Sequence, residues 1–162
     1  MAIALAACSP AAAPNSDKPA AAAKDVDSEP TQGSSPYFGT WTLADARVAP
    51  WWDKKGDAPA ADPAIGTITF AAAKSSGPPI LTCDKPKYTV SVTEPRGLFE
   101  GGLPDADATA KSLGFDITGD ITSMNFSCAA GDNDVSLDFP MLDANTIMLG
   151  LDNMLYTFKR SK

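Results

Sequence analysis

Short segments in which apolar and polar residues alternate fill most of the chain from residue 37 onward. An apolar side chain at every second position gives a strand one face for a core and one face for solvent, which is typical of antiparallel β domains. Clusters of Gly, Pro, Asp and Asn separate the segments and supply the turns. This pattern predicts strands over residues 38–45, 66–70, 80–83, 88–93, 121–128, 135–139, 146–149 and 154–159.

A single stretch has the signals of a helix. Asp105 or Asp107 can serve as its N-cap. Residues 108–113 form one or two turns, and Gly114 ends them. By contrast, the Pro- and charge-rich connection over residues 49–65 fits neither a strand nor a long helix. About eight strands with one short helix predict an all-β fold, which we expect to be a small antiparallel up-and-down barrel, with a β-sandwich as the alternative.

The chain before residue 37 has a different composition. Residues 9–36 contain five Pro, seven Ala and five Ser, and Val26 is their only sizeable apolar side chain. Such a segment cannot bury enough apolar surface to offset the entropy of ordering it, so we expect a disordered, partly polyproline tether. Residues 37–162 then form the β-barrel domain at the end of this tether.

The first eight residues resemble the lipobox of bacterial lipoproteins, in which small residues precede a cysteine that becomes lipidated. The segment Leu5-Ala6-Ala7-Cys8 carries this resemblance. No Lys or Arg precedes it, and its apolar run is shorter than that of a whole signal peptide. We therefore expect residues 1–7 to be a truncated signal peptide whose true start lies upstream.

The lipobox resemblance implies a location for the protein. A lipid on Cys8 would anchor the chain to a membrane, and residues 8–36 would connect this anchor to the domain. Ser9, directly after the cysteine, is the kind of residue that permits sorting to the outer membrane in such lipoproteins. We therefore expect an outer-membrane lipoprotein of the cell envelope whose domain faces the periplasm.

Charge and residue types exclude several classes of function. The chain of 162 residues carries 13 Lys and Arg against 20 Asp and Glu, for a net charge of −7. Binding of nucleic acid requires clustered basic residues, so no nucleic-acid partner is expected. The sequence contains no histidine and no Gly-x-Ser-x-Gly motif, which removes the commonest general base, transition-metal ligand and serine nucleophile. We therefore expect no catalytic residue, no metal site and no cofactor.

Two cysteines, Cys83 and Cys128, lie within the predicted domain. An oxidising periplasm favours their pairing in a structural disulfide, which would stabilise the fold by roughly 4 kcal/mol because it restricts the unfolded chain. Two separate buried thiols or a redox pair are the alternatives, although the sequence contains no Cys-x-x-Cys motif.

The start of the first predicted strand is similar to that of lipocalins and avidins, which are up-and-down barrels. Gly39 and Trp41 form a Gly-x-Trp motif, and Lys159 or Arg160 follows the final strand. In those families the Trp closes one end of the barrel and a basic side chain packs across its ring. The resemblance implies the same roles here, with Trp41 pointing inward, and the whole pattern looks like small lipocalin-like lipoproteins of bacterial envelopes that have no established activity.

Two pairs of apolar residues in predicted loops are candidates for binding. Trp51 and Trp52 can form an aromatic lid at the mouth of a barrel, and Leu98 and Phe99 lie at the tip of a Gly-rich loop. Such side chains grip apolar ligands or the side chains of a protein partner. The alternative is that they only pack on the core or shield a long connection.

These observations predict a non-catalytic envelope lipoprotein that binds a small apolar ligand or a protein partner, and an enzyme inhibitor is one version of such a protein. One alternative is a periplasmic hydrolase that uses paired carboxylates, for example Glu94 with Glu100 or Asp105 with Asp107. Another is a structural or assembly lipoprotein. A hollow interior would favour a ligand, whereas a packed interior with exposed aromatic loops would favour a protein partner.

Overall fold

The computed structural model of the chain describes residues 35–130 and 133–162. The predicted signal segment 1–7, the predicted lipidation site Cys8 and the tether as far as residue 34 lie outside the described residues. Among the residues that the structure describes, no helix has the length and hydropathy that crossing a membrane requires.

Eight antiparallel strands form one sheet in the order β3-β2-β1-β8-β7-β6-β5-β4. The strands are β1 (Gly39–Val48), β2 (Thr67–Ala71), β3 (Lys74–Ser76), β4 (Lys87–Thr93), β5 (Ile121–Ala130), β6 (Asn133–Asp143), β7 (Thr146–Leu151) and β8 (Met154–Arg160). The helical segments are η1 (Pro79–Leu81), η2 (Pro95–Gly101) and α1 (Ala106–Leu113).

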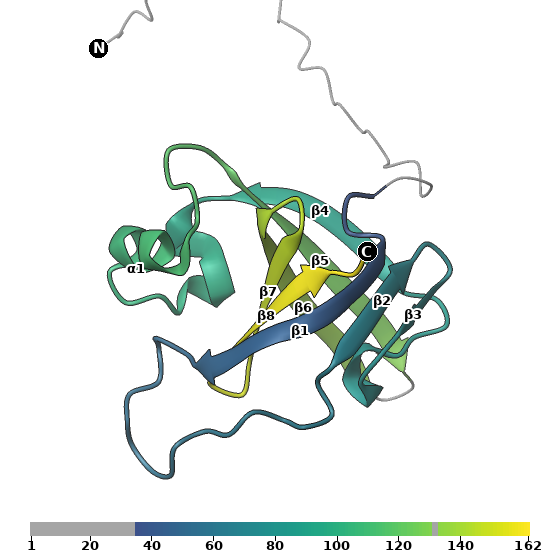
Figure 1. The fold of residues 1–162 in the computed structure, drawn as a ribbon, viewed down its shortest axis with the longest axis horizontal. Coiled ribbons are helices and arrows are strands. Elements are labelled where there is room, and N and C mark those ends of the chain that lie inside the picture. Colours follow the sequence, from purple (N-terminus) through teal and green to yellow (C-terminus); the bar gives the residue numbers. More distant parts are fainter. Residues whose placement is uncertain (1–34, 131–132) are drawn as a thin grey trace, which may run out of the picture.

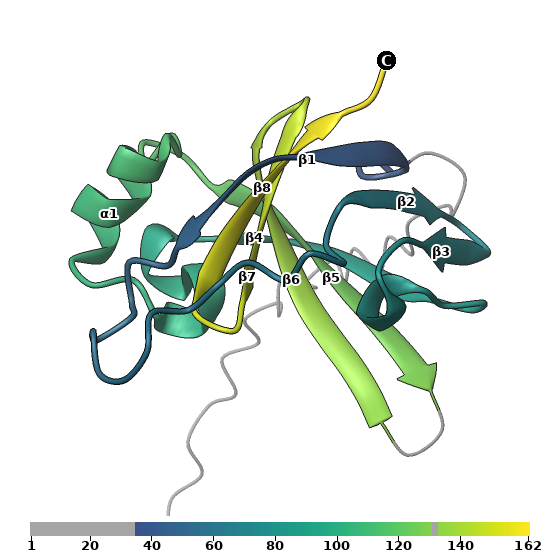
Figure 2. The ribbon, with the colours of Figure 1, turned by 60° about the horizontal axis from the view of Figure 1, so that its bottom comes forward.

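The sheet curls into a half-barrel, as Figures 1 and 2 show. Consecutive strands pair from β4 to β8, and the last strand returns to lie beside the first. The edge strands β3 and β4 are joined by no ladder, but an isolated bridge between Ser75 and Cys83 links β3 to the segment before β4. The predicted disulfide joins Cys83 to Cys128 on β5, with a Cα–Cα distance of 6.1 Å. The prediction of a small all-β barrel fold, rather than a sandwich, is therefore confirmed.

Aromatic side chains fill the concave side of the sheet. The ring of Phe70, on β2, lies with its centroid 6.0 Å from that of Phe126 on β5 and 5.2 Å from that of Phe139 on β6. Strands at opposite ends of the sheet therefore contact each other inside the curl. All three rings are fully buried, as is Trp41. The interior of the described domain is packed rather than hollow.

A second apolar cluster lies on the convex side, under η2 and α1. Residues on β7 alternate between the two sides: Ile147 belongs to the inner core, whereas Met148 packs with the helical layer. In β8, Leu155 points to the same outer layer as Met148. Because both faces of these strands are covered, β7 begins with a run of buried residues in place of a clean alternation.

The structure corrects one predicted strand. Residues 80–83 do not form a strand, because Pro78 and Pro79 precede them and the chain makes a 3₁₀ turn in which the N–H of Leu81 donates to the carbonyl oxygen of Pro78 (2.8 Å). The strand that follows β2 in the chain is instead β3, which is three residues long and lies in the connection between two predicted strands.

The predicted helix is present as α1 and begins at Ala106, two residues before the predicted turns. Asp105 occupies the N-cap position, but its side chain makes no capping hydrogen bond. Gly114 ends the helix as predicted, with a left-handed φ of 98°.

Candidate functional site

Trp51 and Phe99, two of the predicted binding residues, come together on the convex side of the sheet. Trp51 follows β1, Phe99 belongs to η2, and their ring centroids are 5.2 Å apart at an interplanar angle of 32°. Both rings rest on Gly150 of β7. A Cβ atom at that position would lie 2.9 Å from Trp51 Cη2 and 3.0 Å from Phe99 Cδ1. A residue without a side chain is therefore needed under the aromatic pair.

The backbone at Phe99 is unusual for a residue with a side chain. Phe99 and Glu100 have φ values of 50° and 58°, in the left-handed region. Such conformations cost roughly 1–3 kcal/mol each and are often found at binding sites. This turn leaves Phe99 half-buried, while the preceding Leu98 is buried in the convex core. Gly102 also approaches Trp51, since a Cβ atom at this glycine would lie 3.6 Å from Trp51 Cγ.

The aromatic pair lines a groove of about 270 Å³ whose remaining walls are largely polar. Three carboxylates belong to it: Glu100 beside Phe99, Asp138 on β6, and Asp152 in the turn between β7 and β8. No Lys or Arg is among the described residues that line it. Asp138 is oriented by Asn125, whose Nδ2 donates a hydrogen bond of 2.9 Å to its carboxylate. We call this site the aromatic groove; it combines two aromatic rings with negative charge.

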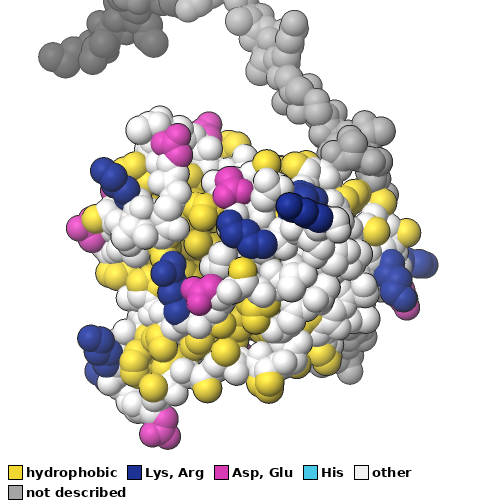
Figure 3. Space-filling model, viewed as in Figure 1, with side chains coloured by type: hydrophobic (Ala, Val, Ile, Leu, Met, Phe, Trp, Pro, Cys, Tyr) yellow, Lys and Arg dark blue, Asp and Glu magenta, His cyan; other side chains and the backbone are white. Residues whose placement is uncertain are grey.

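The other two predicted binding residues lie elsewhere. Leu98 is only 1% exposed and packs in the convex core, so the prediction that it forms an apolar binding tip is wrong. Trp52 is half-buried next to Trp51 but does not line the aromatic groove, and its backbone N–H donates to the carbonyl oxygen of Ala49 (3.1 Å). Hydrophobic side chains gather over the long connection between β1 and β2, at the lower left of Figure 3.

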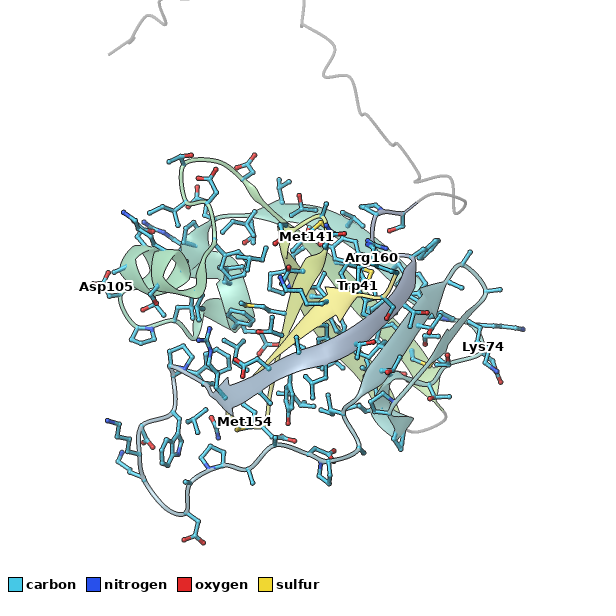
Figure 4. The ribbon with its side chains drawn as sticks, viewed as in Figure 1. Trp41, Lys74, Asp105, Met141, Met154 and Arg160 are labelled. Carbon is cyan, nitrogen blue, oxygen red and sulfur yellow. A yellow bond between two sulfur atoms is a disulfide. The ribbon has the colours of Figure 1, made fainter. Side chains whose placement is uncertain are left out.

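Trp41 lies at the other end of the β1–β8 pair. In this pair Trp41 is opposite Arg160, whereas Val48, which leads to Trp51, is opposite Met154. The Arg160 guanidinium carbon lies 4.1 Å from the centroid of the Trp41 ring. Figure 4 labels these two residues next to each other. The predicted stacking of a C-terminal cation on this indole is therefore present, and Lys159 instead donates to Thr146 (2.5 Å).

Hydrogen bonds hold this stacked pair in place. The Trp41 Nε1–H donates to the carbonyl oxygen of Tyr37 (2.8 Å). Arg160 donates to the carbonyl oxygens of Phe38 (2.8 Å), Ala144 (3.2 Å) and Pro36. At Gly39, where φ is 126°, a Cβ atom would lie 3.0 Å from Arg160 Nη1. The Gly-x-Trp motif therefore leaves room for the guanidinium.

The carboxylates considered for catalysis are distributed over different surfaces. Glu100 lines the aromatic groove, whereas Glu94 and Asp107 line a polar groove that also contains Arg96. The predicted pair Glu94 and Glu100 is therefore not brought into one groove. Among residues 35–130 and 133–162 there is no group of three or more Asp, Glu, Cys or His side chains placed to hold a metal ion.

Most residues of the aromatic groove were not predicted from the sequence. Asp138 and Ser136 alternate with apolar residues along β6, so their outward direction was readable from the pattern. Gly150 was not singled out, although a glycine inside a strand often marks a close approach of another group. What the pattern did not contain is the position of η2 over β7, which brings these residues together.

No family model matches this chain, and the comparisons with curated proteins and with solved structures give no match either.

Proposed function

We propose that this protein is a non-catalytic lipoprotein of the cell envelope that binds a protein partner through the aromatic groove. The observation that carries this proposal is the contrast between the two faces of the sheet. Buried rings such as Phe70 and Phe126 fill the concave face, where a lipocalin-type ligand would bind. The half-buried rings of Trp51 and Phe99 lie instead in an open groove on the outside.

The groove has the properties of an anchor site for a protein side chain. Trp is among the residues that most often carry the binding energy of an interface. The rings of Trp51 and Phe99 pack on each other and on Gly150, so part of their side-chain freedom is already lost before a partner binds. An inhibitor of an envelope enzyme is one form that such a partner binder can take.

The envelope location rests on the lipobox resemblance at Cys8 and on the disulfide between Cys83 and Cys128. Disulfides persist in oxidising compartments such as the periplasm, which supports this location. The anchor is tested by mass spectrometry of the membrane fraction. We expect a peptide that begins with a diacylglyceryl-modified Cys8, and an unmodified peptide that begins at Met1 would contradict the anchor.

The binding function is tested by affinity capture from solubilised envelopes of the source cells, with the full chain as bait. We compare Trp51→Ala with the neighbouring Trp52→Ala. We also compare Ser136→Tyr, which fills the groove, with Ser112→Tyr on the exposed side of α1. A cooperative thermal transition of each variant establishes that it is folded.

We expect a protein that is retained by the wild-type chain and by both control variants, and that Trp51→Ala and Ser136→Tyr lose. The two groove variants change the site in opposite directions, because one removes a ring and the other adds one. Retention of the same proteins by all five chains would refute binding through the aromatic groove.

A further inference from the structure

We infer that the aromatic groove accepts a cationic side chain, best an arginine, from the partner. This inference rests on the proposed function and names the chemistry of the group that binds. The first reason is charge. Glu100, Asp138 and Asp152 line the groove without a Lys or Arg among the described lining residues. These carboxylates attract a cation, whereas an anionic or apolar group would leave their charges unpaired on being covered.

The second reason is the pair of aromatic faces. A guanidinium or ammonium group over an indole is attracted by the negative face of the ring, and Arg also stacks on it through its planar group. The same fold already uses this contact at Trp41, where Arg160 lies 4.1 Å from the ring centroid. Trp51 offers an indole with carboxylates nearby and with no intramolecular cation over it in the described residues.

The third reason is geometry. Asn125 holds the carboxylate of Asp138 through a hydrogen bond of 2.9 Å, so one acceptor of the groove is fixed before a partner binds. A guanidinium presents its donors in a planar fork that suits such a carboxylate while its face rests on a ring. The volume of about 270 Å³ leaves room for a long side chain that enters from one side.

Two grooves elsewhere on the described domain lack one or both of these features. The polar groove at Glu94 and Asp107 contains its own Arg96 and no aromatic ring. Another groove, near the disulfide, contains Lys85 and Lys87. A cationic ligand should therefore prefer the aromatic groove, and Glu94 provides a matched carboxylate outside it.

The test is a titration of the oxidised, ¹⁵N-labelled full chain with N-acetylarginine methylamide, followed by NMR. N-acetylcitrulline methylamide, which has the same shape without the charge, and N-acetylnorleucine methylamide, which is apolar, serve as comparison probes. The indole N–H signal of Trp51, assigned by its absence from Trp51→Phe, reports binding. We expect saturable shifts with the arginine probe and at least about tenfold weaker binding of the two neutral probes.

Variants locate the charge. Glu100→Gln and Asp152→Asn should each weaken binding of the arginine probe by about threefold, whereas Glu94→Gln should leave it unchanged. Raising NaCl from about 50 to about 500 mM should also weaken it. The inference fails if citrulline or norleucine binds as tightly as arginine, or if Glu94→Gln has the same effect as Glu100→Gln.

The two proposals can fail separately. If envelope capture depends on Trp51 but the arginine probe does not shift its signal, the cation inference is wrong and the partner-binding function stands. If the arginine probe binds but no captured protein depends on Trp51, the groove recognises a cation and the proposed protein-binding function is wrong.

Discussion

Two indole rings, near opposite ends of the β1–β8 pair, have contrasting surroundings. Trp41 is fully buried, its N–H is hydrogen-bonded, and a guanidinium covers its ring. Trp51 is half-buried against Phe99, with carboxylates around it and no cation among the described residues of its groove. At the Trp41 end the chain supplies both partners of the cation–aromatic contact. At the Trp51 end, the described residues supply the aromatic and acidic groups but no cation.

This difference separates stability from binding. An aromatic ring that is closed off by its own chain contributes to the free energy of unfolding, whereas a rigid ring left partly open contributes to association. Variants at the Trp41 end should therefore change stability, and matched variants at the Trp51 end should change binding.

The largest effect is expected from Trp41→Ala. Removing a fully buried indole from the inner core should lower the free energy of unfolding by about 3–5 kcal/mol, because the cavity cannot close completely. The measurement is urea denaturation of the oxidised chain, with Trp51→Ala as the matched control. The control should lose clearly less stability, and equal losses would contradict the division of roles between the two rings.

Two glycines provide the next comparison. Gly39→Ala places a side chain at a φ of 126° and 3.0 Å from the Arg160 guanidinium, so we expect a loss of about 1–3 kcal/mol in stability. Gly150→Ala meets no such backbone constraint, but its Cβ lies 2.9 Å from Trp51. It should change stability by less than about 1 kcal/mol and still abolish binding of the arginine probe.

Urea denaturation and the NMR titration, applied to both glycine variants, measure these two effects. The comparison fails if Gly39→Ala is harmless, or if Gly150→Ala retains the affinity of the wild-type chain.

Arg160→Met tests the role of the cation at the Trp41 end. The substitution keeps most of the apolar stem and removes the contact with Trp41 and the hydrogen bonds to the backbone carbonyls, so we expect a loss of about 2 kcal/mol. The matched variant is Lys159→Met, whose exposed ammonium group bonds only Thr146 among the described residues, and it should cost less than about 1 kcal/mol. If Lys159→Met lowers the free energy of unfolding more than Arg160→Met in urea denaturation, Arg160 is not the main stabilising cation at the Trp41 end.

The sequence pattern predicted the Trp41 end better than the aromatic groove. Trp41 and Arg160 belong to the paired strands β1 and β8, which begin and end the sequence of the domain. Period-two alternation predicted that Trp41 points inward, and the resemblance to lipocalins and avidins implied that Lys159 or Arg160 packs across its ring. The disulfide was also predictable, because Cys83 and Cys128 are the only candidates within the domain. Strand prediction failed at residues 80–83, where prolines outweighed an apolar run.

The groove could be predicted only in part because its residues come from distant segments. Trp51 and Phe99 were recognisable as aromatic residues in loops, but their contact depends on how η2 folds over the convex face. Leu98 is buried, whereas the adjacent Phe99 lines the aromatic groove. The left-handed backbone at Phe99 could not be predicted, because the residue at this position is not a glycine. Local patterns do not determine such a tertiary arrangement.

The smallest expected effect is a dependence of the free energy of unfolding on pH, caused by Asp143 at the Trp41 end. Asp143 accepts hydrogen bonds from the backbone N–H of Asn145 (2.7 Å) and the hydroxyl of Thr146 (2.8 Å), which together hold the pKa of its carboxyl below the ordinary value, with a smaller contribution from the charge of Lys159. In the same turn, the carbonyl oxygen of Asn145 accepts a hydrogen bond from the backbone N–H of Arg160 (2.9 Å).

Because the folded-state pKa of Asp143 is lowered, its carboxylate stabilises the fold at pH values above about 4, the ordinary carboxyl pKa, and this contribution is lost as the pH falls through the lower folded-state value. We therefore expect Asp143→Asn to be less stable than the wild-type chain at neutral pH, and the difference to shrink below about pH 4. Urea denaturation of both chains between about pH 7 and pH 3 measures this difference. A stability difference that stays constant over this range would show that Asp143 acts through packing and not through its charge. A difference that shrinks at low pH would show that the charged carboxylate of Asp143 stabilises the turn next to Arg160.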